Sequence, residues 1–94
     1  MKTNKDRLWL VEIWNADILT GRSVLTTLKG VHQFTKVHLD ASTLNMEYKT
    51  LCREAAVRPV LLWDRSKWNT EEEALYNPEA RHIQVSIVPL IKIK

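Results

Sequence analysis

The last fourteen residues of the chain, RHIQVSIVPLIKIK, alternate in polarity. Every odd position from Ile83 to Ile93 is apolar and several even positions are polar, which is the period of a β-strand with one face in a core. At about 3.3 Å per residue the run is longer than a small domain needs. It must bend at Pro89 or pair in part with a partner. We therefore expect this last strand, with Lys92 and Lys94 at its end, either to be a sheet edge that contacts a partner or to be an internal strand whose last two lysines reach the solvent.

The size of the chain limits it to one small domain. Ninety-four residues, 45% of them apolar and 27% charged, are typical of a globular protein with a single core, so we predict one domain over 1–94, with 1–6 frayed. Cys52 is the only cysteine, which excludes an internal disulfide and fits the reducing cytoplasm. No segment approaches the ~20 apolar residues of a membrane span. A cytoplasmic protein without a membrane partner is expected.

The net charge of the chain is small and its basic residues are dispersed. Fourteen basic and eleven acidic residues give +3, and no block of lysine or arginine marks a nucleic-acid-binding arm. The basic residues are spread along the chain, which is typical of a solvated surface. The charge alone therefore predicts no particular partner.

The first half of the chain contains one clear strand and one ambiguous stretch. Residues 7–15 indicate an interior strand because both faces are largely apolar, and Thr20–Arg22 indicates a turn. Between 23 and 40 the apolar residues can be placed on a helical stripe, but Gly30 and three threonines disfavour a helix. We therefore predict two short strands around Gly30, over 23–29 and 33–39.

The second half contains the clearest helix. Residues 43–56 place one apolar stripe on a helix that Ser42 or Thr43 can cap. Residues 60–63 predict a buried strand, followed by a loop and by a short helix over 70–76. The predicted fold is α+β: a mostly antiparallel sheet of four or five strands, with one main helix at 43–56 and one short helix at 70–76.

The residue types that catalysis needs are present, but their spacing does not favour it. The residues that could ligate a metal lack a metal-site spacing, so no metal or other cofactor is predicted: His32, His38, His82 and Cys52. His82 is expected on the polar face of the last strand, and Cys52 on a buried helical stripe. Two glycines in the whole chain nearly exclude a glycine-rich phosphate loop. Glu12, among apolar neighbours, is a weak candidate for an acid or base.

A small basic endoribonuclease is the least favoured of three functions. Such an enzyme needs cationic and proton-transferring side chains in one cleft. The chain offers suitable residues, but no spacing joins them: Arg53, Arg65, Lys67, Arg81 and His82. We therefore predict that the protein is not an enzyme and has no catalytic residue.

The segment WDRSKW places Trp63 and Trp68 on either side of Arg65 and Lys67. Proteins that bind single-stranded nucleic acids combine aromatic platforms with cations in this way. A tryptophan beside an arginine is also the usual composition of a protein-binding hot spot. Trp63 ends an apolar run and can instead belong to the core, and Asp64 lowers the local charge.

We predict a non-enzymatic protein-binding module. Its predicted contact residues lie in this loop and at the end of the last strand: Trp63, Arg65, Lys67, Trp68, Lys92 and Lys94. The expected partner is another protein or a second copy of the chain. A compact chain without motifs and with many tryptophans is typical of phage or mobile-element accessory proteins, which bind and modulate host complexes. The alternative is single-stranded nucleic-acid binding through the same loop, which a steep salt dependence distinguishes.

Overall fold

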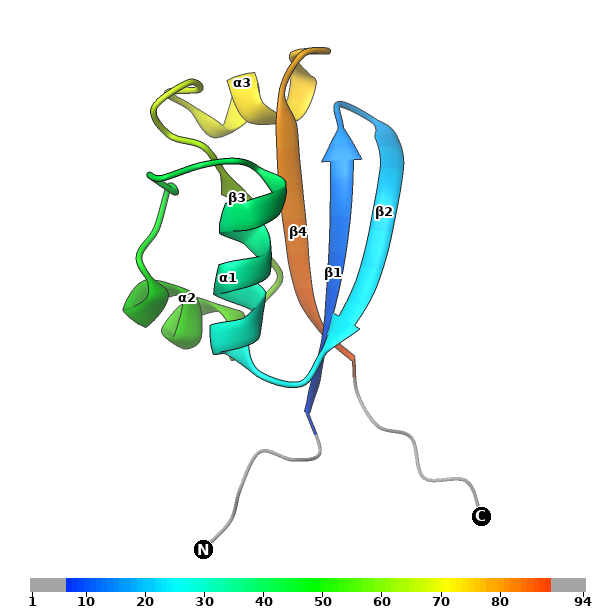
Figure 1. Ribbon diagram of the computed structural model, residues 1–94, viewed down its shortest axis with the longest axis vertical. Coiled ribbons are helices and arrows are strands. Elements are labelled where there is room, and N and C mark those ends of the chain that lie inside the picture. The colour runs from blue at the N-terminus through cyan, green and yellow to red at the C-terminus, as the bar shows by residue number, and fades with distance from the viewer. Residues whose placement is uncertain (1–6, 89–94) are drawn as a thin grey trace, which may run out of the picture.

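In residues 7–88, which the computed structural model describes, four strands form one antiparallel sheet in the order β2-β1-β4-β3 (Figure 1). The strands are β1 (Leu8–Asn15), β2 (Ile18–Leu25), β3 (Val60–Trp63) and β4 (Arg81–Val88). The helices are α1 (Leu28–His38), α2 (Tyr48–Ala55) and α3 (Glu71–Tyr76). The predicted α+β fold with an antiparallel sheet is confirmed.

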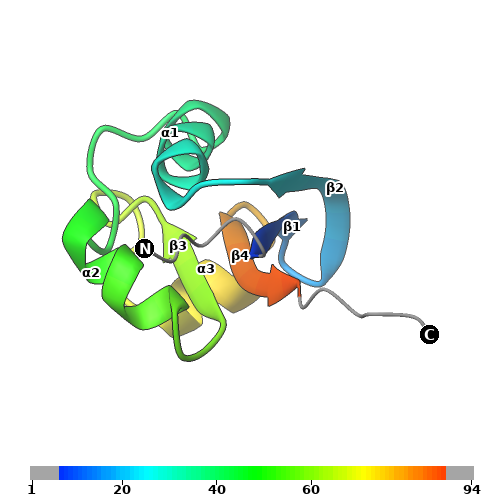
Figure 2. The ribbon, with the colours of Figure 1, turned by 90° about the horizontal axis from the view of Figure 1, so that it is seen from below.

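The hydrophobic core lies between one face of the sheet and the helices α1 and α2 (Figure 2). The interior strand predicted over 7–15 is confirmed as β1, and its alternate residues Trp9, Val11 and Ile13 are all buried in this core. β4 alternates in the same way, and its Ile83 and Val85 lie opposite Ile13 and Val11. Because both central strands bury the same face, a slip by one residue would expose the core side chains, and the register is fixed.

Residues 28–38 form a helix, so of the two short strands predicted around Gly30 the second, over 33–39, is wrong, and the first is correct only for residues 23–25, which end β2. Thr27 is the N-cap of α1, and its hydroxyl oxygen accepts a hydrogen bond from the Gly30 N–H at 3.0 Å. Thr35 is buried, and its hydroxyl donates to the Val31 carbonyl at 2.8 Å within the same helix. The threonines that argued against a helix are therefore bonded inside it or cap it.

The predicted helix over 43–56 begins only with α2. The preceding residues run beside β3, where Leu44 forms an isolated antiparallel bridge with Asp64. The Thr43 hydroxyl donates to the Asp64 carboxylate at 3.4 Å, so it does not cap a helix as predicted. Two stripe positions in the shorter helix are fully buried, as predicted: Leu51 and Ala55.

The turn predicted at Thr20–Arg22 is wrong, because those residues lie inside β2. The chain turns earlier, at Ala16, whose φ of 52° lies in the left-handed region. Gly21 lies close to Ile13, since a Cβ atom there would lie 3.2 Å from Ile13 Cδ1 and would displace the end of that side chain by a few tenths of an ångström. Thr20 is an extra residue in the strand, because Ile13 pairs with Gly21 and Trp14 pairs with Leu19. β2 therefore contains a β-bulge.

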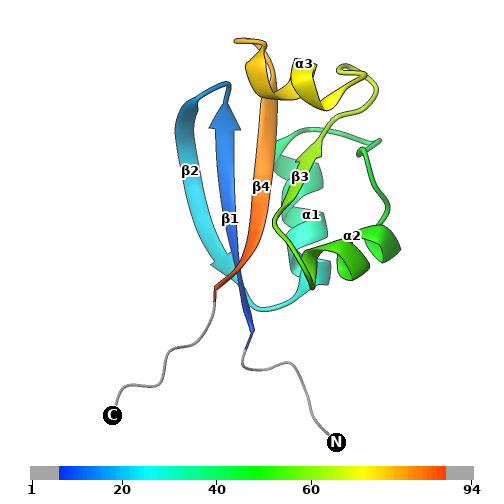
Figure 3. The ribbon, with the colours of Figure 1, turned by 180° about the vertical axis from the view of Figure 1, so that it is seen from behind.

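The face of the sheet opposite α1 is covered at one end only (Figure 3). There α3 packs against β4 and buries Ala74 and His82. His82 is 4% exposed, so the expectation of a wet histidine is wrong: the residue is on the predicted face, but α3 covers it. No helix of the described chain covers the rest of this face, away from α3 along β1 and β2.

β4 is an interior strand that pairs with β1 on one side and β3 on the other. Of the two expectations for the last strand, a free edge is excluded from His82 to Val85, where both edges are hydrogen-bonded, whereas from Ser86 to Val88 the strand pairs with β1 alone. The remaining positions of that prediction, including Lys92 and Lys94, lie outside the described residues, as do residues 1–6. The two edges of the sheet are β2 and β3.

Candidate functional site

Trp63 and Trp68 lie at the two ends of a folded loop that follows β3. Trp63 is 9% exposed, and its indole N–H donates to the Trp68 backbone carbonyl at 2.8 Å. Trp68 is half-buried, whereas Arg65 and Lys67 between them are exposed. Three of the four residues predicted for this loop can therefore meet a partner, while Trp63 offers little surface.

Asp64 holds this loop in place. Its Oδ1 accepts hydrogen bonds from the Ser66 backbone N–H at 3.0 Å and from the Ser66 hydroxyl at 2.6 Å. The side chain is buried, so the carboxylate is an acceptor beneath the loop. Stacking of nucleic-acid bases on both indoles would require Trp63 to leave its buried position. The nucleic-acid alternative thus keeps one aromatic platform in this conformation, that of Trp68.

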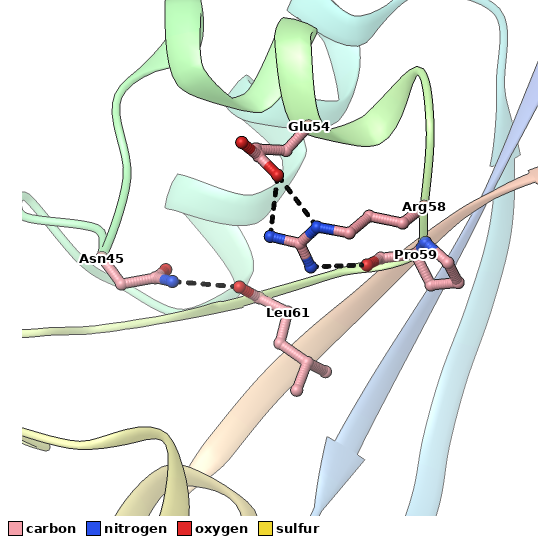
Figure 4. Close-up of polar contacts among 5 residues, drawn as sticks. All are labelled: Asn45, Glu54, Arg58, Pro59 and Leu61. Atoms are coloured by element: carbon pink, nitrogen blue, oxygen red, sulfur yellow. Dashed lines mark hydrogen bonds and ion pairs between the residues drawn. The ribbon is translucent and has the colours of Figure 1, made fainter.

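The outer edge of β3 is closed by a side chain that imitates a further strand (Figure 4). Asn45 Nδ2 donates to the Leu61 carbonyl and Asn45 Oδ1 accepts from the Trp63 N–H, each at 3.0 Å. Two backbone bonds of 3.1 Å continue the pairing, from the Asn45 N–H to the Trp63 carbonyl and from the Arg65 N–H to the Thr43 carbonyl. These bonds occupy backbone groups that a further strand would need.

Arg58 closes the start of the same edge. Its guanidinium donates to the Pro59 carbonyl at 3.3 Å and forms an ion pair with Glu54 at 2.8 Å (Figure 4). Pro59 itself has no backbone N–H to offer a partner. A strand can therefore pair with β3 only by displacing Asn45 and Arg58, which makes this edge a poor docking site.

The outer edge of β2 is open. β2 pairs with β1 alone, and alternate residues of an antiparallel strand direct their N–H and C=O groups away from the neighbour. Within residues 7–88, no side chain or loop forms a hydrogen bond to the backbone of β2 on that side, and no element lies beside it (Figures 1 and 2). The strand, ILTGRSVL, contains neither lysine nor proline, the residues that commonly protect an edge.

β2 also exposes more large apolar side chains than any other strand of the described chain. The exposed fractions are 64% for Ile18, 53% for Val24 and 38% for Leu19. Arg22 is the only charged residue of the strand, and its guanidinium lies 3.0 Å from Glu12 Oε2. This free edge, β2 from Ile18 to Leu25, therefore combines unpaired backbone groups with apolar side chains and a charge that already has a partner.

An apolar depression of about 690 Å³ adjoins the start of β2 near α3. Its apolar and aromatic walls come from the end of β1, the start of β2, and α3 with the residues after it: Trp14, Ile18, Leu75, Tyr76, Pro78 and His82. The rings of Trp14 and His82 are nearly parallel, with centroids 6.5 Å apart. Trp14 Nε1 and His82 Nδ1 are buried and have no hydrogen-bond partner among the described residues. The depression extends the apolar surface of the free edge.

The burial of His82 predicts a stability that depends on pH. Burial lowers the pKa of His82 below the usual 6.5, and a hydrogen bond with the Ala74 backbone partly opposes this effect. Because the unfolded chain then binds more protons than the folded one, the free energy of unfolding falls as the pH drops below 6.5. Denaturant unfolding at pH 7.5 and pH 5.5 should show this loss, and His82→Gln should reduce it.

His32 contributes to the same pH dependence. Burial, with a smaller contribution from Lys36, also lowers the pKa of His32, so His32→Gln should reduce the loss as well. An unchanged pH dependence in His82→Gln would contradict the assignment to this buried ring.

The other candidates for chemistry are not assembled into a site within the described chain. Glu12, the candidate acid or base, is the ion-pair partner of Arg22. Among residues 7–88 there is no group of three or more His, Cys, Asp and Glu side chains that could hold a metal ion. Lys67 and Arg81 of the nuclease candidates line one cavity of about 230 Å³, but Asp40 and Glu79 line it as well. The carboxylates of that cavity oppose phosphate binding.

Cys52 is half-buried on α2, so the expectation of full burial is only partly met.

None of the helices in the described part of the chain is long and apolar enough to cross a membrane. Comparison with protein-family models, with curated proteins and with solved structures finds no match to this chain.

Proposed function

We propose that the protein is a non-enzymatic binding module that pairs its free edge with an extended segment of another polypeptide. The observation that carries this proposal is the difference between the two sheet edges: Asn45 and Arg58 close β3, whereas β2 is open. A strand added to β2 gains backbone hydrogen bonds along its length. It also covers apolar side chains that are otherwise in water: Ile18, Leu19 and Val24.

The depression beside β2 supports the same function. Ile18 belongs both to the free edge and to the wall of the depression. An extended segment paired with the start of β2 passes this wall, where a side chain can contact Trp14 and Tyr76. Aromatic walls favour an apolar or aromatic anchor residue, because such anchors supply most of the binding energy of small interfaces.

The Arg65–Trp68 loop is a separate candidate surface. It follows β3, at the opposite edge of the sheet from β2, so one short segment cannot pair along β2 and contact this loop together. The two surfaces can therefore be distinguished by single substitutions, one on each. The loop presents two cations, whereas the free edge presents apolar groups and backbone.

Val24→Lys is expected to abolish partner binding while the protein stays folded. Lysine on an exposed edge strand opposes the addition of a further strand, because its charge would be desolvated between the two chains. Val24 is half-exposed, so the stability should change by less than about 1 kcal/mol. The measurement is a tagged pull-down from a lysate, with and without nuclease, quantified by mass spectrometry for wild type and variant.

Val57→Lys is the matched control, because Val57 is 79% exposed and lies far from β2 in the sequence. It should retain the partner that Val24→Lys loses. If binding persists in Val24→Lys and Trp68→Ala weakens it by ~2 kcal/mol or more, the loop is the interface and the proposed site is wrong. Recovery that disappears with nuclease would instead favour the nucleic-acid alternative.

A further inference from the structure

We infer that the extended segment taken up by the free edge is β2 of a second copy of this chain, so that two copies form one continuous sheet. This inference rests on the proposed function and names its partner. Two copies related by a two-fold axis perpendicular to the sheet place their edge strands antiparallel, and each backbone then offers the donors and acceptors that the other lacks. The self-pairing therefore needs no further element.

The geometry of such a pair limits its register. Residues opposite each other in an antiparallel pair point to the same face, so a two-fold pair must place one residue opposite its own copy. Centring the pair on Gly21 brings the bulge at Thr20 into the ladder. Centring it on Arg22 places two like charges directly opposite each other, which is destabilising. Centring it on Val24 avoids both problems but pairs only Ser23–Leu25 within β2, whereas centring it on Ser23 avoids both and pairs Gly21–Leu25.

In the register centred on Ser23, the regular part of β2 pairs along its whole length. Val24 then lies opposite Arg22 of the second copy, on the face that carries the Arg22–Glu12 ion pair. The aliphatic part of the arginine side chain can cover Val24 there. On the other face, Leu25 lies opposite Gly21 of the second copy, where the neighbour it meets is the Ile13 side chain that packs over Gly21.

The closed edge of β3 explains why this pairing ends at two copies. Two free edges on one sheet allow chain after chain to add, which produces open-ended assemblies. Here Asn45 occupies the Leu61 carbonyl and the Trp63 N–H of β3, and Arg58 occupies the Pro59 carbonyl just before that strand, so in the described part of each copy β2 is the more open of the two sheet edges. Once two β2 strands have paired, the edge backbone that remains unpaired in the described part of each chain is short: the start of β2 before the bulge and the end of β4 beyond its pairing with β3.

The first test is the mass of the purified protein in solution as a function of concentration, by sedimentation equilibrium. The wild type should approach twice the mass of one chain as the concentration rises. Val24→Lys should raise the dissociation constant by at least about tenfold, because the new lysine faces Arg22 of the second copy. Val57→Lys should leave it unchanged within about twofold. The thermal midpoint of each variant shows whether it is folded.

The second test fixes the register by cysteine cross-linking. In an antiparallel pair, opposite Cα atoms lie about 4.5–5.5 Å apart, which a disulfide can bridge. Ser23→Cys lies opposite its own copy and should give a disulfide-linked dimer under oxidised glutathione. In Val24→Cys the new cysteine lies opposite Arg22 of the second copy, about two residues along the strand from the other new cysteine. It should therefore cross-link far more slowly. Both variants carry Cys52→Ser, which removes the native thiol.

Cross-linking of Ser23→Cys but not of Val24→Cys, together with a concentration-dependent dimer, supports the inference. A wild type that stays monomeric at the highest concentration overturns it, as does equal cross-linking at both positions. These outcomes are separate from those of the pull-down. A monomer whose capture of a foreign protein depends on Val24 refutes the second copy as partner and leaves the binding function of the free edge intact.

Discussion

Leu62→Ala is expected to lower the free energy of unfolding by about 2–5 kcal/mol. Leu62 is fully buried in β3, opposite Ile83, which is also fully buried. The removed side chain would leave a cavity between the sheet and α2 that β4 and the helix cannot collapse to fill. Urea unfolding followed by tryptophan fluorescence measures the change, with an unchanged dependence on urea concentration showing that the native fold is retained.

Leu61→Ala is the matched control for this prediction. Leu61 is the preceding residue of the same strand, but it points to the opposite face and is half-buried. Its truncation removes the same atoms from a partly wet site, so a loss of about 1 kcal/mol is expected. Equal losses for the two variants would show that the two faces of β3 are equally buried, which contradicts the alternation described above.

The strands of the core could be predicted from the sequence because their side-chain pattern is local. In β1, β3 and β4 one face is continuously apolar, and a period of two in the chain directly gives a period of two in space. The short helix after Thr70 was also predicted, because its cap is local: the Thr70 hydroxyl accepts from the Glu73 N–H at 3.2 Å.

The wrong predictions concern polar side chains whose effect on secondary structure depends on where they form their hydrogen bonds. Thr27 and Thr35 lower helix propensity on average, but one caps α1 and the other bonds inside it, so the average preference misled. Asn45 lies in a segment whose apolar residues follow a helical stripe, yet its side-chain amide bonds to β3. Its partner there, Trp63, lies eighteen residues further along the chain. Contacts over such separations override local propensity and cannot be read from a short window.

The candidate interface was missed for a related reason. Alternation in the last strand shows that one face is buried, but it does not show whether an edge of that strand is free. That depends on the order of strands in the sheet, which places β4 between β1 and β3. β2 escaped notice because Gly21 and the extra residue Thr20 break its alternation. A sequence signal did exist: ILTGRSVL has apolar residues at both ends and no edge-protecting lysine or proline.

Asn45→Ala is expected to have two effects, one on stability and one on assembly. The substitution leaves the Leu61 carbonyl and the Trp63 N–H without their partners, which should lower the free energy of unfolding by about 2–3 kcal/mol. It also opens part of the β3 edge, so that a folded chain has two edges able to pair. Light scattering should then show growth beyond the dimer as the concentration rises.

The two effects can be separated with matched variants. Asn69→Ala truncates an exposed asparagine that belongs to neither edge of the sheet. It should change the free energy of unfolding by no more than about 0.5 kcal/mol and should leave assembly unchanged. Combining Asn45→Ala with Val24→Lys keeps the loss of stability but blocks the β2 edge, so growth should stop because each chain again has one edge to offer. Growth that continues in the double variant would show that assembly does not proceed through β2, and that Asn45 protects the protein from aggregation in some other way.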